Sequence, residues 1–238
     1  MLEQRYYEAI QALLTRIADS QAPAVATGAA KVADSLMQGG ILHVFGSGHS
    51  AMIGKEITHR AGGLVPVNLV PDPAGGLAER VEGYGKVLFQ DYKRKYGLQH
   101  GEVLIVVSTS GRNPVPIEVA LEAQAEGLFA VAITSVEYSR LAPSRHSSGK
   151  RLFEVVDLVL DNCVPPGDAI VEVEPLRQRS GASSTLAGAL LANMLVLRAI
   201  EEILARGGSP PILKSQNLGG ADAFNRQLLA AYRGRLTF

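Results

Sequence analysis

The sequence predicts an α/β fold, a three-layer α-β-α sandwich around a five-stranded parallel sheet. Apolar runs rich in β-branched residues alternate along the chain with patterns of helical period, which is typical of a parallel sheet covered by helices on both faces. The clearest run is Val103–Val107, where five consecutive apolar residues include four β-branched ones. An unbroken run of this kind indicates a strand buried on both faces, so we expect it at the centre of the sheet.

The remaining elements follow from the same periodicities. Apolar residues recur at helical spacing over residues 3 to 37, and we expect Pro23 to break or restart this long N-terminal helix. Strands are predicted at 41–45, 64–70, 103–107, 128–133 and 155–160, with helices at 51–61, 87–96, 116–125 and 186–204. Residues 169–173 alternate as a final extended piece, and a glycine-rich turn at 215–225 leads into a last short helix. We treat 1–238 as a single domain, with 1–39 as an N-terminal helical extension and 205–238 as a C-terminal tail.

Composition excludes several classes of function. Acidic and basic residues balance at 23 each, and aromatic residues make up only 5%, so we expect no nucleic-acid partner. The single cysteine, Cys163, excludes an intramolecular disulfide framework and fits a reducing cytosol. The N-terminus is polar, and Asn193 and Arg198 interrupt the apolar stretch at 186–200, so we expect a cytoplasmic protein without a membrane span. No Cys and His cluster has the spacing of metal ligands, and neither a metal nor a cofactor is expected.

Two strand-to-helix junctions share one construction. Glycine and hydroxyl residues follow the first and third strands, in the stretches Gly46–Ser50 and Ser108–Asn113. Helix N-termini suit anions, and ligands of open α/β sheets bind at the carboxyl ends of strands. We therefore predict a phosphate site, whose alternative is an ordinary turn capped by Ser and Asn. The predicted phosphate-binding residues are Gly48, His49, Ser50, Ser108, Thr109, Ser110, Gly111 and Asn113.

Two further interpretations of possible ligand-binding residues stay open. Ser183, Ser184 and Thr185 precede the helix at 186–204 and are either substrate-binding residues or a plain helix cap. A dinucleotide site would need a third glycine at Ala51 and an acid about twenty residues later, where Asp72 lies within a turn.

The two loop sequences, Gly46–Ser50 and Ser108–Asn113, resemble those of the sugar isomerase, or SIS, domain family, and the second is the more specific. Within that family the chain is most similar to the UPF0309 group, through Lys55–Gly63, Ser183–Gly188 and Asn217–Asp222. The resemblance covers the whole chain. It implies a flavodoxin-like fold, binding of a phosphosugar through the loop hydroxyls and amides, and a homodimer or higher oligomer.

A partial resemblance to the N-acetylmuramic acid 6-phosphate etherases lies in Ala74–Gly83, which is similar to their Ala-Gly-Gly and Val-Glu-Gly segment. Carried over by position, it implies catalytic roles for Glu82 and for Glu56, in the helix after the first loop. The first loop departs from the etherase sequence Gly-Thr-Ser-Gly-Arg and contains His49 instead. Asn113 stands where many SIS loops have another hydroxyl. The resemblance therefore implies the fold and the phosphate site for this chain, but it does not imply the etherase reaction.

Aldose–ketose isomerisation and α,β-elimination both need a base that removes a proton next to a carbonyl. Both also need an acid that protonates a carbonyl, ring or leaving oxygen. Glu56 and His59 are three residues apart on the predicted helix at 51–61 and would share a face. Together with Glu82 they are our catalytic candidates, ahead of Glu79. The predicted function is a metal-independent phosphosugar isomerase or lyase (etherase). A non-catalytic sugar-phosphate sensor and a nucleotide-binding enzyme are the alternatives. The long N-terminal helix and the apolar helix at 186–204 predict a homodimer.

Overall fold

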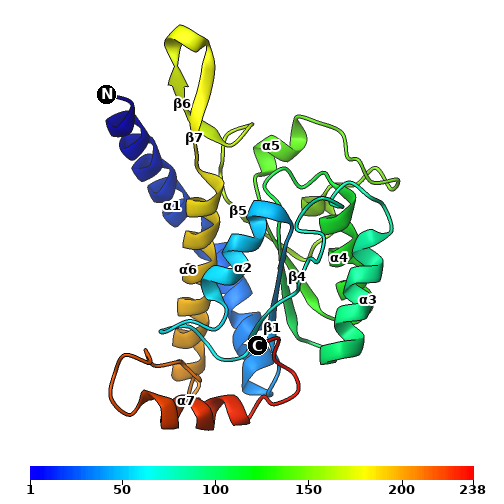
Figure 1. Ribbon diagram of the computed structural model, residues 1–238, viewed down its shortest axis with the longest axis vertical. Coiled ribbons are helices and arrows are strands. Elements are labelled where there is room, and N and C mark those ends of the chain that lie inside the picture. The colour runs from blue at the N-terminus through cyan, green and yellow to red at the C-terminus, as the bar shows by residue number, and fades with distance from the viewer.

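The computed structural model describes residues 1–238 and confirms the α/β sandwich (Figure 1). Five parallel strands form one sheet in the order β2-β1-β3-β4-β5. The strands are β1 Leu42–Gly46, β2 Val67–Leu69, β3 Val103–Val107, β4 Phe129–Thr134 and β5 Leu158–Asp161. The predicted central strand is β3, and every residue of it is buried.

Helices cover both faces of the sheet. One face carries α1 Leu2–Met37, α2 Ala51–Ile57 and α6 Ser184–Ala205, and the other carries α3 Tyr84–Tyr96 and α4 Pro114–Ala125. Side chains alternate between the faces, so Val103, Ile105 and Val107 belong to the first core and Leu104 and Val106 to the second. Burying one such side chain contributes about 1.5–3 kcal/mol, which makes these two cores the main source of stability.

The N-terminal helix is one continuous element, and the predicted break at Pro23 is wrong. Pro23 lies within α1 on its exposed side. Ile17 before it and Val25, Ala29 and Val32 after it are buried in the same core, so the apolar stripe keeps its phase through the proline. Packing on both sides of Pro23 offsets the roughly 3 kcal/mol that an internal proline costs a helix. No helix in the chain is both long and apolar enough to pass through a lipid bilayer.

A hairpin replaces the single extended piece that was expected near residue 170. β6 Ala169–Val173 pairs antiparallel with β7 Gln178–Ala182, and the hairpin extends beside the N-terminal part of α1 (Figure 1). The Tyr6 hydroxyl donates to the Ala182 carbonyl at 2.8 Å and joins the two. The sequence of β7 lacks β-branched and aromatic residues, so its strand character is not visible from composition. The remaining short elements are the helices α5 Val136–Arg140 and α7 Ala221–Ala230 and the 3₁₀ turns η1 Gly48–Ser50, η2 Leu152–Glu154 and η3 Glu174–Leu176.

The C-terminal tail covers a buried polar network near the amino ends of β1 and β3. Asn68 donates to the Arg235 carbonyl at 2.6 Å and accepts from the Thr237 N–H at 3.0 Å. The Arg235 guanidinium lies 2.9 Å from buried Glu102, which also bonds His43 at 3.1 Å. Burial lowers the pKa of His43 despite this contact. Burial would raise the pKa of Glu102, but the bonds from His43 and the charge of Arg235 bring it below its ordinary value.

Candidate functional site

The loops that follow β1 and β3 lie next to each other at the carboxyl edge of the sheet. The two strands are neighbours, and Gly46 pairs with Val107 at the last step of their register. Both loops line an open hollow of about 430 Å³, together with residues of the turns at 71–83 and the start of α6. Its lining includes Gly48, His49, Ser50, Ser108, Thr109, Ser110 and Asn113, and the remaining predicted residue, Gly111, lies between the last two.

Many hydrogen-bond donors of these loops have no partner in the protein. The backbone N–H groups of residues 47–49 and 109–112 donate no hydrogen bond. The hydroxyl groups of Ser50, Ser108, Thr109 and Ser110 make none either, and all four residues line the hollow. An anion with several acceptor oxygens matches such a group of neighbouring donors.

The carbonyl groups of the loop after β3 accept hydrogen bonds from other segments of the protein. The Ser139 hydroxyl donates to the Ser110 carbonyl at 2.6 Å, and the Leu152 N–H donates to the Gly111 carbonyl at 2.8 Å. Because a trans peptide directs its C=O and N–H in opposite directions, the N–H groups that follow point away from these contacts. Gly111 has a φ of +57°, and a Cβ there would lie 2.7 Å from the Ser139 Oγ. Only glycine fits this position without moving its neighbours.

Asp72 fixes the turns at 71–83 against the first loop. Its carboxylate accepts hydrogen bonds from the Ser47 hydroxyl at 2.6 Å and from the Tyr84 hydroxyl at 3.0 Å. It also accepts from the N–H groups of Ala74 at 3.1 Å and Gly76 at 2.9 Å. Burial and the bond to Asp72 raise the pKa of Tyr84, which keeps this hydroxyl a donor. Asp72 therefore joins the turns at 71–83 to the first loop at one wall of the hollow.

A second aspartate caps α6. Asp168 accepts from the N–H groups of Ser183 at 2.9 Å and Ser184 at 2.7 Å, and from the Ser184 hydroxyl at 2.9 Å. The Ser183 hydroxyl donates to the Asp168 carbonyl at 2.8 Å. The carboxylate thus takes the place at the helix N-terminus where an anion would bind. Ser184 and Asp168 line the hollow, whereas Ser183 and Thr185 do not.

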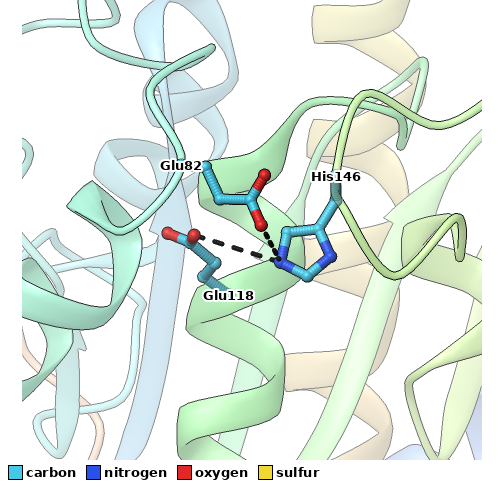
Figure 2. Close-up of side chains that lie close together, drawn as sticks. All are labelled: Glu82, Glu118 and His146. Atoms are coloured by element: carbon cyan, nitrogen blue, oxygen red, sulfur yellow. Dashed lines mark ion pairs between the residues drawn. The ribbon is translucent and has the colours of Figure 1, made fainter.

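Next to the hollow, Glu82, Glu118 and His146 come together from the loop at 71–83, from α4 and from the loop at 141–150 (Figure 2). The His146 Nε2 lies 3.6 Å from Glu82 and 4.0 Å from Glu118. Hydrogen bonds from the Ser147 hydroxyl and N–H, together with the charge of His146, lower the pKa of Glu82.

These three side chains offer one metal-ligand atom each within 4.8 Å of one another, although the sequence predicted no such cluster. Glu118 already accepts hydrogen bonds from the N–H groups of Gly83 and Gly85, the latter at 2.8 Å, and so caps the start of α3. Glu82 accepts the bonds from Ser147. Glu82, Glu118 and His146 therefore act as a clamp that joins three segments of the chain. Both carboxylates of the clamp already accept hydrogen bonds from protein donors.

Comparison with known proteins identifies the family. The SIS domain family matches residues 5–135. A UPF0309 protein of Shouchella clausii is 37% identical over 245 residues, which cover 99% of this chain and 98% of that protein. The chain belongs to the SIS domain family. Within it, the chain groups with the UPF0309 proteins.

Solved structures share the fold of this SIS domain at low identity. A phosphoheptose isomerase from Francisella tularensis superposes with a TM-score of 0.60 at 21% identity, covering 83% of this chain and 96% of that one. The Vibrio vulnificus NanR protein, complexed with ManNAc-6P, superposes with a TM-score of 0.56 at 16% identity, covering 87% and 65%. One neighbour is an isomerase and the other is a protein bound to a phosphosugar.

The expected catalytic residues on the second helix of this SIS domain do not line the hollow. Glu56 is on α2 and pairs with Arg60. The expectation that Glu56 and His59 share a helix face is wrong, because α2 ends at Ile57. His59 has a left-handed φ of 47°, and its ring stacks on Phe238 with 3.9 Å between centroids.

In the turns at 71–83, Glu79 lines the hollow and Glu82 does not. The resemblance to the etherases favours Glu82 over Glu79, whereas the hollow contains Glu79. The direction in which each turn faces depends on the hydrogen bonds of Asp72, which a linear sequence does not show. Tyr138 and Asp168 also line the hollow and were missed, because α5 and the approach to the hairpin reach it only through the tertiary fold.

Proposed function

We propose that this SIS domain binds the phosphate group of a phosphosugar in the hollow between the β1 and β3 loops. The observation that carries this proposal is the set of unpartnered N–H groups at 47–49 and 109–112, joined by four unpartnered hydroxyls. A hydrogen bond to a charged acceptor is worth about 1.5–3 kcal/mol, so a few of these donors are enough to hold a phosphate. The likeness to an isomerase and to a phosphosugar-bound protein supports the same ligand class.

We further propose that the protein is a metal-independent phosphosugar isomerase or lyase that uses general acid/base catalysis. Glu79 is our candidate for the base that removes a proton beside the sugar carbonyl, and His49 for the group that protonates an oxygen. Both line the hollow, and neither side chain forms a hydrogen bond in the protein. Glu82 is held in the clamp with Ser147 and His146, so it positions the loop at 141–150. The one cluster with metal-ligand spacing lies outside the hollow.

A thermal-shift panel of hexose and amino-sugar 6-phosphates tests the binding step. Ligand at about 100 times its dissociation constant adds roughly 2.7 kcal/mol, which corresponds to a rise in Tm of about 5–10 °C for a chain of this size. Ser110→Ala is expected to remove most of that rise without lowering the Tm of the free protein. The unphosphorylated sugars and NAD serve as controls. A rise with NAD alone contradicts the proposal.

Turnover of the sugar phosphate that binds tests the reaction. We expect Glu79→Gln to lower kcat at least a hundredfold while the affinity for substrate persists, since general acid/base groups contribute about 10²–10⁴-fold. Glu82→Gln is the matched control and keeps most of the activity. Equal activity of wild type and Glu79→Gln excludes Glu79 as the base, and loss of turnover in Glu82→Gln alone would restore the assignment implied by the etherases.

A non-catalytic sensor is the second candidate function, favoured by the likeness to the sugar isomerase domain of an RpiR transcription factor from Sphaerobacter thermophilus, at a TM-score of 0.51 and 14% identity. In that case the wild-type protein binds the sugar phosphate through Ser110 and turns over none of the panel.

A further inference from the structure

Three arginines from three different segments are next to residues that line the hollow, Arg80 and Arg112 along the chain and Arg145 through a hydrogen bond, and none of them has an acidic partner. Arg80 belongs to the turns at 71–83, Arg112 to the loop after β3 and Arg145 to the loop at 141–150. No carboxylate oxygen lies within 4.0 Å of their guanidinium nitrogens, whereas elsewhere on the surface Arg151 pairs with one carboxylate and Arg206 with two. Their positive charges are therefore uncompensated by direct ion pairs.

Direct contacts connect Arg145 to the loop after β3, which contains Arg112. The Arg145 Nη1 donates to the Asn113 Oδ1 at 2.8 Å, and Asn113 lines the hollow. The Arg145 N–H donates to the Arg112 carbonyl at 2.8 Å. The Nε of Arg112 is buried and has no hydrogen-bond partner. Buried donors without a partner are rare because they cost free energy, and a bound ligand that accepts the bond removes that cost.

The local charges also leave a positive excess. Loss of water and the like charges of Arg80 and Arg112 lower the pKa of Arg145, and the neighbouring Glu79 and Tyr138 offset part of this effect. Asn113, which accepts the hydrogen bond from Arg145, lines the hollow, so Arg145 lies at its rim. Arg80 and Arg112 are the cations that act on Arg145, and Glu79 is the carboxylate that offsets them, so an anion bound beside Arg145 would relieve the repulsion.

The loop that carries Arg145 is held in place before any ligand binds. The next residue, His146, belongs to the clamp with Glu82 and Glu118 (Figure 2). The residue after it, Ser147, donates its N–H to Glu82. A guanidinium on an anchored loop loses little conformational entropy when it meets an anion. Its planar fork suits the paired oxygens of a carboxylate or a phosphate.

We infer that Arg145, with Arg112 and Arg80, forms a second anion subsite beside the phosphate-binding loops, so that the preferred ligand is a phosphosugar with a second anionic group. This inference rests on the proposed function, since the first anionic group is the phosphate in the hollow. The second group is a carboxylate or another phosphate, which share the oxygen geometry that the arginines recognise.

Calorimetric titration of the full chain with two matched pairs of ligands tests the inference. Sorbitol 6-phosphate and 6-phosphogluconate are both acyclic and differ by a carboxylate, and fructose 6-phosphate and fructose 1,6-bisphosphate differ by a phosphate. In at least one pair, we expect the member with two anionic groups to bind at least about tenfold more tightly than the monophosphate, which corresponds to one additional charge-assisted hydrogen bond. Arg145→Gln should bring that ratio near one by weakening the member with two anionic groups much more than the monophosphate, since Arg145 contacts the phosphate loop only through Asn113. Arg140→Gln, a nearby arginine that lies over Phe153, is the matched control and keeps the wild-type ratio.

The outcomes separate this inference from the proposed function. Ratios near one in both pairs, or equal weakening of both members by Arg145→Gln, overturn the second subsite. If Ser110→Ala still weakens every ligand, the phosphate site stands while the second subsite falls. If no ligand of either pair binds, or if Ser110→Ala changes no affinity, the proposed function fails and the inference fails with it.

Discussion

Gly76 shows how single residues shape the hollow. Its φ is +93°, and a Cβ there would lie 2.9 Å from the backbone N and Cα of Gly48. The turns at 71–83 and the first loop therefore meet through two glycines with no side chain between them. Asp72 holds this approach by accepting from the Gly76 N–H and from the Ser47 hydroxyl.

Gly76→Ala is expected to weaken phosphosugar binding at least tenfold, because the added methyl group displaces Gly48 and its free N–H. Gly75→Ala is the matched control, since Gly75 also has a positive φ of +58° but a Cβ there meets nothing within 4 Å. Both variants carry the backbone strain of about 1 kcal/mol, and only the first changes the loop contact. Calorimetric affinities and urea denaturation of both variants separate the two effects. Equal affinities would contradict this account of the loop contact.

At the scale of single residues, the sequence predicted the donors better than the acids. Ser108, Ser110 and their neighbours follow directly from a strand end, so local sequence locates them relative to the sheet. Local sequence does not locate the acids in this way. Glu79 and Glu82 are only three residues apart in the turns at 71–83, but Glu79 lines the hollow and Glu82 belongs to the clamp.

At the scale of elements, the strands and most helices were predictable because buried β-branched runs and helical periods are local signals. Two features were not. Pro23 stays inside α1 because packing of the whole helix outweighs a local preference. The strand β7 forms because β6 offers it a pairing edge, although its own residues are polar or small.

The C-terminal tail is an element with a testable dependence on pH. Buried His43 has a lowered pKa, so the folded protein keeps it neutral while the unfolded chain takes up a proton below about pH 6.5. The contribution of His43 to the free energy of unfolding is therefore fully present above about pH 6.5, and it is lost as the pH decreases below that value. The lowered pKa of Glu102 adds a further loss below about pH 4.5.

Urea denaturation at pH 8 and pH 5 measures this dependence. We expect wild type to lose up to about 1.4 kcal/mol for each unit by which the His43 pKa lies below its ordinary value. His43→Gln keeps a donor toward Glu102 but does not titrate, so its loss between the two pH values should be smaller. An identical loss in wild type and variant would show that His43 does not control this range.

At the scale of the whole molecule, one face of α6 remains apolar and exposed. Leu186, Leu197 and Leu204 are 43%, 59% and 56% exposed, and their spacings of 11 and 7 residues place them on one side of the helix. The N-terminal part of α1 exposes Leu2 and Tyr7 as well. A stripe of this kind is typical of a surface that another chain covers.

We expect light scattering to give at least twice the 25.2 kDa mass of the chain. Leu197→Glu should reduce the mass to that of a monomer without changing the helical circular dichroism, because a charge is costly in an apolar interface. Leu121→Glu, on α4 at the opposite face of the sheet, serves as the control and stays oligomeric. A monomeric wild type would refute the homodimer.

For the whole molecule, we propose that the free N–H groups after β1 and β3 bind the phosphate of a phosphosugar. The most direct measurement is a titration of the ¹⁵N-labelled protein with a sugar 6-phosphate, followed by the amide resonances. We predict saturable shifts of the amides of Gly48, Ser110 and Gly111, and none for Gly97 or Gly207 at distant helix ends. The unphosphorylated sugar should leave all of them in place. Saturable shifts that spare residues 47–49 and 109–112 would contradict the account.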